Sequence, residues 1–572
     1  MNSPEAPPGF RRAVAAARRS MGRRFSRRNL KEDASAGAVL GIESVPDGLA
    51  NAILAGVNPM AGLYAYMLGL TGGALFTGTA MMAVGVTGAM ALVVADVNLS
   101  SFDDPTAALV TLSLLTGVVM IVAGAARLGK LVRFVPTAVM TGFVAAVGVN
   151  IILGQLGNLT GTEPDEGNRI LNAIWILTHP FQLNWWSTAL GLVSIALIVW
   201  LSTTKLGPLG MVLAVVVATL AALGVNAWQS ETIAVVGDVA DIESGFPPLA
   251  LPDLSLIPAL VVPALSLAFV GLIQGAAVTT SVADPDKGPA NNSQDFVAQG
   301  AGNIASGIFA GMPVGASMSG STLVAQAGAR SRTALLIASL TLMLIVVLLG
   351  DVVSAVAMPA LAALLITVGY AAIKPGKVRS VIKTGAFQTS LMAVTFVLTL
   401  LIPLHLAVLV GVALGFLLFV SQASNTLVLK GLDVDASGEI RETKPPAHLA
   451  GADVQVLQPY GSMFFASAPI FEKQLPTVDA HSAGAIVIFR MRGIDQVGLS
   501  HVEVLRRFSS RVIGQGGTVK FIVTSQAVRD QFERERLVSL VGESNVYRGG
   551  EWLGRATREA VSDALDEIAR SR

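Results

Sequence analysis

The sequence contains no cysteine, and only 13% of its 572 residues are charged. Without cysteine there can be no disulfide scaffold, no thiolate metal site and no thiol redox centre. None of the five histidines has the spacing of a metal-ligand motif. A net charge of +1 leaves no general footprint for nucleic-acid binding. Secreted disulfide proteins, zinc-cysteine proteins and nucleic-acid binders are therefore excluded.

The few charges are unevenly distributed along the chain. Residues 1–33 hold nine Lys or Arg and three Asp or Glu, residues 34–430 hold 13 and 17, and residues 431–572 hold 17 and 18. A soluble domain is usually about 25% charged, and the middle block lies far below that level. We therefore predict a basic cytoplasmic tail (1–33), a transmembrane domain (34–430), a linker (431–450) and a soluble domain (451–572).

The middle block is apolar over lengths that can cross a membrane. A spanning helix needs about 20 apolar residues, and the block contains about fourteen such segments, some of them short or interrupted by glycine. The clearest lie at 107–126, 135–153, 187–201, 211–225, 257–281, 335–349, 352–373, 391–401 and 406–420. The prediction is an all-α polytopic membrane domain of about 14 spans.

Lysine and arginine positions orient these spans. With the basic tail inside and fourteen crossings, 12 of the 13 Lys and Arg residues of the block fall on the cytoplasmic side, and only Arg169 falls outside. We therefore expect an integral plasma-membrane protein with both termini in the cytoplasm. The basic tail can lie along anionic membrane lipid, or it serves only to set the topology.

The C-terminal segment has the pattern of a small α/β domain. The continuous apolar run at 485–489 predicts a buried strand, 519–523 a second buried strand, and 454–457 a further strand. Helical spacing follows at 499–513, 526–541 and 551–568. Alternation of strands and helices predicts one sheet with helices against it, and the nearly balanced charge is typical of a regulatory or assembly module.

Two glycine-rich interruptions lie inside the apolar block, at 76–90 (FTGTAMMAVGVTGAM) and 309–322 (FAGMPVGASMSGST). Paired interruptions in the two halves of a membrane protein indicate a transporter with internal repeats. A helix that begins at mid-membrane exposes unpaired N–H groups and a positive dipole end, and both attract an anion. The alternative is that these small residues only allow helices to pack closely in lipid.

The acids inside the spans are few, and they include Glu43, Asp47 and Asp295. A charge at membrane depth is costly and usually functional. Pro46 and Gly48 are expected to break the helix around Asp47, which can then bind a proton or Na⁺. The alternative is that Glu43 or Asp47 caps the start of a helix near the membrane surface.

The segment 45–64 (VPDGLANAILAGVNPMAGLY) resembles the first spans of the sulfate-permease (SulP) anion transporters. The C-terminal segment is similar to the STAS domain that follows the membrane part in that family. This resemblance implies two inverted repeats of seven spans each, with a core domain that moves against a gate domain in an elevator-like alternation. It also implies a homodimer and a STAS-like cytoplasmic domain that contributes to assembly and regulation.

In that family the anion lies between the N-termini of the third and tenth spans. The resemblance therefore assigns anion binding to two short segments of this chain, and it requires no cofactor other than Na⁺ or H⁺ as a coupling ion. The segments comprise Thr87, Gly88, Ala89 and Met90 in the first half, and Ser317, Met318, Ser319 and Gly320 in the second.

Two positions depart from the family pattern. The first-span glutamine is replaced by Asp47, and the eighth-span position that often carries a coupling acid is Gln274. Coupling through Gln274 is therefore in doubt, and our hypothesis is that Asp47 has taken over the coupling role.

Secondary active transport of a small inorganic anion of the sulfate, bicarbonate or chloride class is the function that these patterns favour. A non-transporting membrane sensor that signals through its C-terminal domain is one alternative, and a nucleobase permease with the same broken spans is another. An enzyme is disfavoured, because the sequence has no Ser–His–acid set, P-loop or metal cluster.

Overall fold

The computed structural model describes residues 29–571 except for 131–134, 163, 165–167, 205, 208, 230–232, 241–244, 283–290, 403, 435–438, 452 and 551–553. The chain divides between Gly415 and Phe416 into two compact units. The first unit is a helical membrane domain, and the second is a mixed α/β domain.

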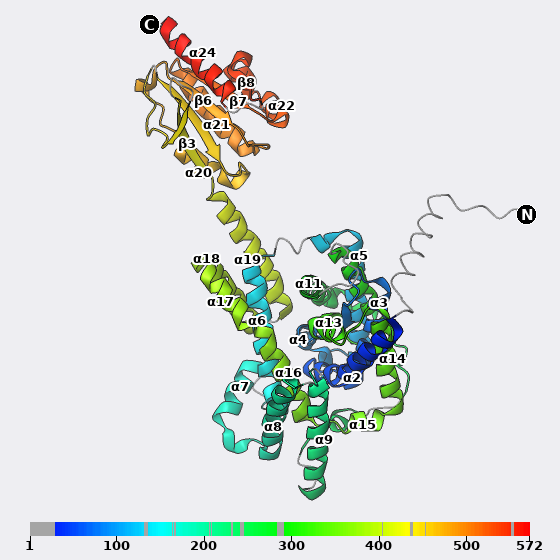
Figure 1. Cartoon of the computed structure of the whole chain (residues 1–572). Coiled ribbons are helices and arrows are strands. Elements are labelled where there is room, and N and C mark those ends of the chain that lie inside the picture. Colours follow the sequence, from blue (N-terminus) through cyan, green and yellow to red (C-terminus); the bar gives the residue numbers. More distant parts are fainter. Residues whose placement is uncertain are drawn as a thin grey trace, which may run out of the picture. The chain divides into compact units, whose positions relative to one another are not determined.

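The helices of the membrane unit pack in two groups (Figure 1). The first bundle contains the two short helices described below with the site, together with α2 (Leu30–Leu54), α3 (Pro59–Phe76), α5 (Pro105–Ala125), α11 (Ile257–Ser281), α12 (Asn292–Ile308) and α14 (Thr333–Leu348). The second bundle contains α6 (Thr137–Thr160), α7 (Arg169–Thr178), α8 (Trp185–Ser202), α9 (Leu209–Gln229), α16 (Met358–Ile373), α17 (Pro375–Thr384) and α18 (Ala386–Leu401).

Three further helices belong to or leave this unit. The short helices α10 (Val236–Val239) and α15 (Gly350–Ser354) contact each other, and α19 (Leu404–Ser424) runs across the division between the units. By length and composition, six helices in the described part of the chain are able to cross a membrane. The count of fourteen spans and the seven-plus-seven inverted repeat stay predictions.

Glycine pairs bring helix backbones into contact within each bundle. A Cβ on Gly62 of α3 would lie 2.1 Å from the carbonyl oxygen of Gly48 on α2, which is closer than any real side chain tolerates. Small residues allow this approach, and membrane helices use it because lipid supplies no hydrophobic force between them. The pairs are Gly48–Gly62 and Gly117–Gly300 in the first bundle and Gly148–Gly369 in the second.

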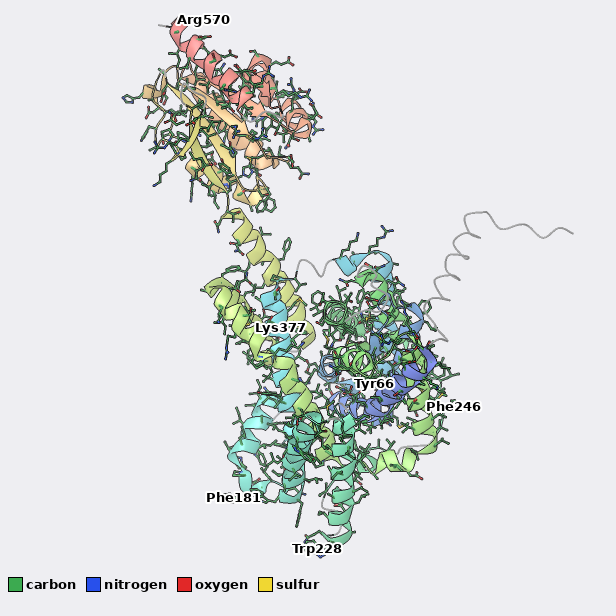
Figure 2. All side chains as sticks on the ribbon, viewed as in Figure 1. Tyr66, Phe181, Trp228, Phe246, Lys377 and Arg570 are labelled. Carbon is green, nitrogen blue, oxygen red and sulfur yellow. The ribbon has the colours of Figure 1, made fainter. Side chains whose placement is uncertain are left out.

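Large apolar side chains cover the outside of the membrane unit. Phe181, before α8, is 92% exposed, and Trp228, in the last turn of α9, is 74% exposed. Both lie at the same end of the unit (Figure 2). Aromatic residues gather at this level where a membrane meets water, so these side chains are placed for contact with lipid.

Helix α2 differs from the expectation that Pro46 and Gly48 break it. The helix is continuous from Leu30 to Leu54, with Pro46 inside it. Gly48 is the contact point for α3 rather than a break. Consequently Glu43 and Asp47 lie in the middle of a long helix and cap no helix start, and both are buried.

The C-terminal unit contains one six-stranded sheet in the order β4-β3-β5-β6-β7-β8. The strands are β3 (Val428–Val434), β4 (Ile440–Thr443), β5 (Val454–Tyr460), β6 (Ile486–Met491), β7 (Thr518–Val523) and β8 (Val546–Arg548). Strands β5 to β8 run parallel, and β3 and β4 are antiparallel additions at one edge.

Strands β3 and β4 include residues of the segment 431–450, for which the sequence indicated a linker. β4 (IRET) is exposed throughout, which matches its position at the sheet edge, whereas β3 lies between β4 and β5 and is partly buried. An edge strand of this kind lacks the apolar run that identifies a buried strand. The sheet therefore begins before the predicted boundary at 451.

Helices cover both faces of this sheet (Figure 1). Along β6, Val487 and Phe489 point to the core on one face, whereas Ile486 and Ile488 point to the core on the other. The first face packs against α20 (Ala468–Gln474), α21 (Leu499–Gly514), α22 (Gln526–Arg534) and α23 (Leu537–Val541), and the second against α24 (Arg555–Ser571). Burial on both faces explains why the strand is an unbroken apolar run.

The single helix expected over 526–541 is two helices, α22 and α23. Arg536 lies between them with a φ of +58°, in the left-handed region. A non-glycine residue rarely adopts this conformation, and arginine gives no signal for it in a sequence. The break was therefore not predictable from composition.

His501 on α21 makes the stability of this domain depend on pH. Its side chain is fully buried and lies 3.2 Å, through Nε2, from Ser467 Oγ, and burial lowers its pKa from 6.5 to about 4. In this pH range His501 binds a proton in the unfolded chain but not in the folded domain. The free energy of unfolding therefore falls as the pH drops below the pKa that His501 has in the unfolded chain. From about pH 7 to about pH 5 we expect a loss of roughly 2 kcal/mol.

Hydrogen exchange in the full-length protein measures this effect. Protection factors of the β6 and β7 amides, corrected for intrinsic exchange rates, should fall about 30-fold over that pH range. His501→Leu should flatten the dependence, and an equally steep dependence in that variant would contradict the assignment.

Candidate functional site

The two glycine-rich segments each form a short strand followed by a half-length helix. The first contains β1 (Ala83–Gly85) and α4 (Gly88–Val97), and the second contains β2 (Gly315–Ser317) and α13 (Met318–Gln326). A helix of ten residues is about 15 Å long, half the thickness of the hydrocarbon core of a bilayer. Neither α4 nor α13 is long enough to cross a membrane.

The two strands pair with each other and connect the two half-helices through one short sheet. β1 and β2 are antiparallel, and Ala83, Val84 and Gly85 lie opposite Ser317, Ala316 and Gly315 respectively. Because α4 follows β1 and α13 follows β2, both N-termini lie beside this two-stranded sheet.

The caps of the two helices leave a defined set of N–H groups unused. Thr87 Oγ1 accepts from the Met90 N–H at 3.3 Å, and Ser317 Oγ accepts from the Gly320 N–H at 3.1 Å. The other first-turn N–H groups have no partner within their own helix. They belong to Gly88 and Ala89 on α4 and to Met318 and Ser319 on α13.

Exposure differs among these residues. Met90 is fully buried, whereas Thr87 and Gly88 are half-buried and Ser319 is exposed. Ser319 Oγ lies 3.1 Å from Ser317 Oγ. The arrangement thus offers two hydroxyl-bearing caps and the positive ends of two helix dipoles in one place, with no lysine or arginine in either segment.

Gln274 of α11 borders this site. Its Nε2 donates to Thr87 Oγ1 at 3.0 Å, and its Oε1 lies 2.6 Å from the position that a Cβ on Gly315 would occupy. Gln274 therefore holds the α4 cap in place, and Gly315 leaves the space that the Gln274 side chain needs.

Helix α2 contributes a second polar wall that faces α4. Tyr66 of α3 donates its hydroxyl to Asp47 Oδ2 at 2.5 Å, and Asn51 Nδ2 donates to Asp47 Oδ1 at 2.9 Å. The Tyr66 ring also borders β1, since its Cε1 lies 2.3 Å from the position that a Cβ on Gly85 would occupy. Figure 2 shows Tyr66 inside the first bundle. Asn51, Asp47 and Tyr66 thus form one hydrogen-bonded group beside β1.

Several residues of this site were not identified from the sequence. Helix α12 satisfies the open edge of β2, since Asn303 donates to Val314 O at 2.7 Å and accepts from Val314 N at 2.9 Å. Gln299 Oε1 accepts from Ala316 N at 3.1 Å. Inside a membrane every backbone group needs a partner. Amides four residues apart on an otherwise apolar helix are the signal that could have revealed them.

Asp295, at the start of α12, holds the loop that leads into β1. Its carboxylate accepts from the N–H groups of Gly78 and Thr79 and from the hydroxyls of Thr77, Thr79 and Thr279, at 2.7 to 3.2 Å. This buried acid is fully engaged in positioning the first half-helix. Among the residues that the structure describes, no cluster of three or more His, Cys, Asp or Glu side chains could hold a metal ion.

Comparisons with known proteins agree with this architecture. Residues 30–395 match the model of the sulfate permease family. A probable sulfate transporter of Mycobacterium tuberculosis is 26% identical over 536 residues, which cover 92% of this chain and 95% of the relative. The bicarbonate transporter BicA of a Picosynechococcus species is 26% identical over 428 residues, 73% of this chain and 75% of the relative.

Solved structures show the same fold. The murine anion transporter named solute carrier 26 family member A9 superposes with a TM-score of 0.82 at 20% identity, over 99% of this chain and 96% of the other. The transmembrane domain of a cyanobacterial bicarbonate transporter gives a TM-score of 0.58 at 23% identity, over 69% of this chain and 98% of the other. With its family match, paired half-helices and C-terminal α/β domain, the chain belongs to the sulfate permease family and is an integral membrane anion transporter.

Proposed function

We propose that this protein moves a small inorganic anion of the sulfate, bicarbonate or chloride class across the plasma membrane by secondary active transport. The anion is held between the N-termini of α4 and α13. The observation that carries the proposal is the antiparallel β1–β2 pairing, which places the starts of α4 and α13 at the two ends of one short sheet.

Electrostatics favours an anion at this place. The N–H groups of Gly88 and Ala89 and those of Met318 and Ser319 point out of the helix starts, where the two dipoles add. Neither segment contains a lysine or arginine. Partial charges without a full counter-charge bind an anion weakly enough for release, which transport requires.

The two bundles are the bodies that move in an elevator-like alternation. Within each bundle the backbones touch through glycine pairs, which makes the bundle rigid. Between the bundles, side chains make contacts that can separate: Ile151 of α6 lies against Gly88, and Arg169 Nη2 of α7 lies 2.8 Å from Asp96 Oδ1 of α4. Arg169 is the residue that departs from the positive-inside pattern, and this ion pair gives it a role between the bundles.

We further propose Asp47 as the residue that binds the coupling ion, H⁺ or Na⁺. It is buried next to the anion site, and it accepts hydrogen bonds from Tyr66 and Asn51. Gln274 is the second candidate, because it contacts the Thr87 cap, but its amide cannot take up a proton at physiological pH. We also propose that both termini lie in the cytoplasm, which the distribution of Lys and Arg supports. A homodimer is a further proposal, which rests on the family resemblance alone.

Purified protein in liposomes tests the proposal. Uptake of labelled sulfate, bicarbonate or chloride, driven by imposed Na⁺ or pH gradients varied separately, is the expected result. Binding of an anion without flux would favour a sensor, and uptake of uracil or xanthine without anion uptake would favour a nucleobase permease. Either outcome would contradict the proposal.

The caps supply a residue-level prediction. Thr87→Ala and Ser317→Ala each remove a cap worth about 1 kcal/mol, and we expect the KM for the anion to rise roughly fivefold in each variant. Asn184→Ala removes the equivalent cap of α8, far from the site in the second bundle, and should leave KM unchanged. Equal KM changes in all three variants would show that capping acts only through stability.

A further inference from the structure

The side chain of Asn51 presents an unused hydrogen-bond acceptor next to the start of α4. Asn51 is 2% exposed, and its Oδ1 has no hydrogen-bond partner among the described residues. This oxygen lies 3.5 Å from the position that a Cβ on Gly88 would occupy. A buried polar atom without a partner is rare and calls for an explanation.

The orientation of this amide is fixed by its nitrogen. Asn51 Nδ2 donates to the backbone oxygen of Asp47 at 2.8 Å and to Asp47 Oδ1 at 2.9 Å. A flipped amide would place its oxygen against the backbone carbonyl, which can only accept. The oxygen therefore faces α4, and it is the carbonyl rather than the amino group that borders the anion site.

The site is thus asymmetric in its hydrogen-bonding character. Donors come from the starts of α4 and α13, through the N–H groups of Gly88, Ala89, Met318 and Ser319. Thr87 adds a hydroxyl whose oxygen accepts from Met90 N and Gln274 Nε2, and which donates to Gln274 Oε1 at 3.4 Å. On the α2 side stand an acceptor, Asn51 Oδ1, and the acid Asp47.

We propose that the anion bound here carries its own O–H donor, a hydrogen-bearing monovalent oxyanion of the bicarbonate kind, whose O–H group donates to Asn51 Oδ1. This inference rests on the proposed transport function and names the substrate class within it. A halide, nitrate or fully deprotonated sulfate offers only acceptors, and each would leave the Asn51 oxygen unpaired and facing negative charge. A site built to bond a substrate hydroxyl discriminates strongly against an analogue that lacks it.

Nitrate is the matched probe, because it is planar and monovalent like bicarbonate but has no O–H group. In liposomes containing the full-length protein at mildly alkaline pH, initial uptake of labelled bicarbonate is measured with nitrate, chloride and sulfate as competitors. We expect bicarbonate to be preferred over nitrate by roughly 10- to 100-fold. This comparison uses the unaltered protein, so it does not depend on the folding of any variant.

Asn51→Leu then assigns the preference to this side chain. The change preserves approximate size and removes the carbonyl, and the bicarbonate-to-nitrate ratio should fall to within about threefold of unity. Asn150→Leu is the control, since Asn150 of α6 is equally buried and bonds only to the carbonyl of Thr399 among the described contacts. It should leave the ratio unchanged.

The outcomes separate this inference from the function on which it rests. Equal handling of bicarbonate and nitrate by the unaltered protein would overturn the inference alone. Loss of Na⁺ dependence in Asn51→Leu with an unchanged ratio would mean that the carbonyl binds a cation, which also overturns it. Absence of flux for every anion would overturn the proposed function and this inference with it.

Discussion

Replacing Asp47 with asparagine is expected to abolish the dependence of anion uptake on an ion gradient. Asn has nearly the same size and can still bond with Asn51 and Tyr66, which hold Asp47 in place. It cannot take up a proton or supply a carboxylate to Na⁺. We expect gradient-driven accumulation in liposomes to fall at least about tenfold, while downhill exchange of the anion changes only a few-fold.

Two variants sharpen this result. Asp351→Asn removes an exposed acid from the short helix α15 and should leave coupling intact. Tyr66→Phe keeps the acid but removes the hydroxyl that donates to Asp47 Oδ2 and holds it in place, so coupling should weaken in the same direction. Gradient-driven uptake that persists unchanged in Asp47→Asn would refute the coupling role of this residue.

Replacing Gly85 with alanine is expected to disable transport with a single added methyl group. A Cβ at this position would lie 2.3 Å from Cε1 of Tyr66, so either the ring must leave Asp47 or β1 must separate from β2. Overpacking of this kind costs about 1 to 3 kcal/mol. We expect the initial rate of anion uptake to fall about ten- to hundredfold.

The matched control is Gly224→Ala on α9, where an added Cβ meets no atom within 4 Å. This variant should transport at the normal rate, because alanine also favours the helix. If Gly85→Ala transported as fast as Gly224→Ala, the rate of transport would not depend on the close contact between Tyr66 and the paired strands.

The sequence predicted those features best that depend on the composition of a few neighbouring residues. The interruptions at 76–90 and 309–322 differ from their apolar surroundings in glycine and hydroxyl content, and the two short strands and the starts of the half-helices lie within them. The strand at 485–489 is an unbroken apolar run because both of its faces are buried. The break at Pro46 was expected from a local rule, and packing of α3 against Gly48 overrode that rule.

The polar partners of the site were not found in this way. Tyr66, Gln299 and Asn303 meet groups outside their own helices, 19, 17 and 11 residues away along the chain, and the spacing of the two α12 amides does not say which groups they will meet. Their roles depend on where the helices cross, and close glycine pairs elsewhere in the chain determine these crossings. Arg536 is a similar case, since its left-handed backbone follows from the packing of α22 and α23.

By itself the sequence determined that this chain enters a membrane many times and ends in an α/β domain, because hydropathy and charge are sums over neighbouring residues. It also determined where helices must stop short, since glycine and hydroxyl residues change the local cost of leaving a helix. Only the tertiary structure decided that the segments before the two half-helices pair as β1 and β2, and that Asp47, Tyr66 and Asn51 lie beside them. The physical reason is that hydrogen bonds inside a membrane join whichever groups the packing of distant helices brings within about 3 Å.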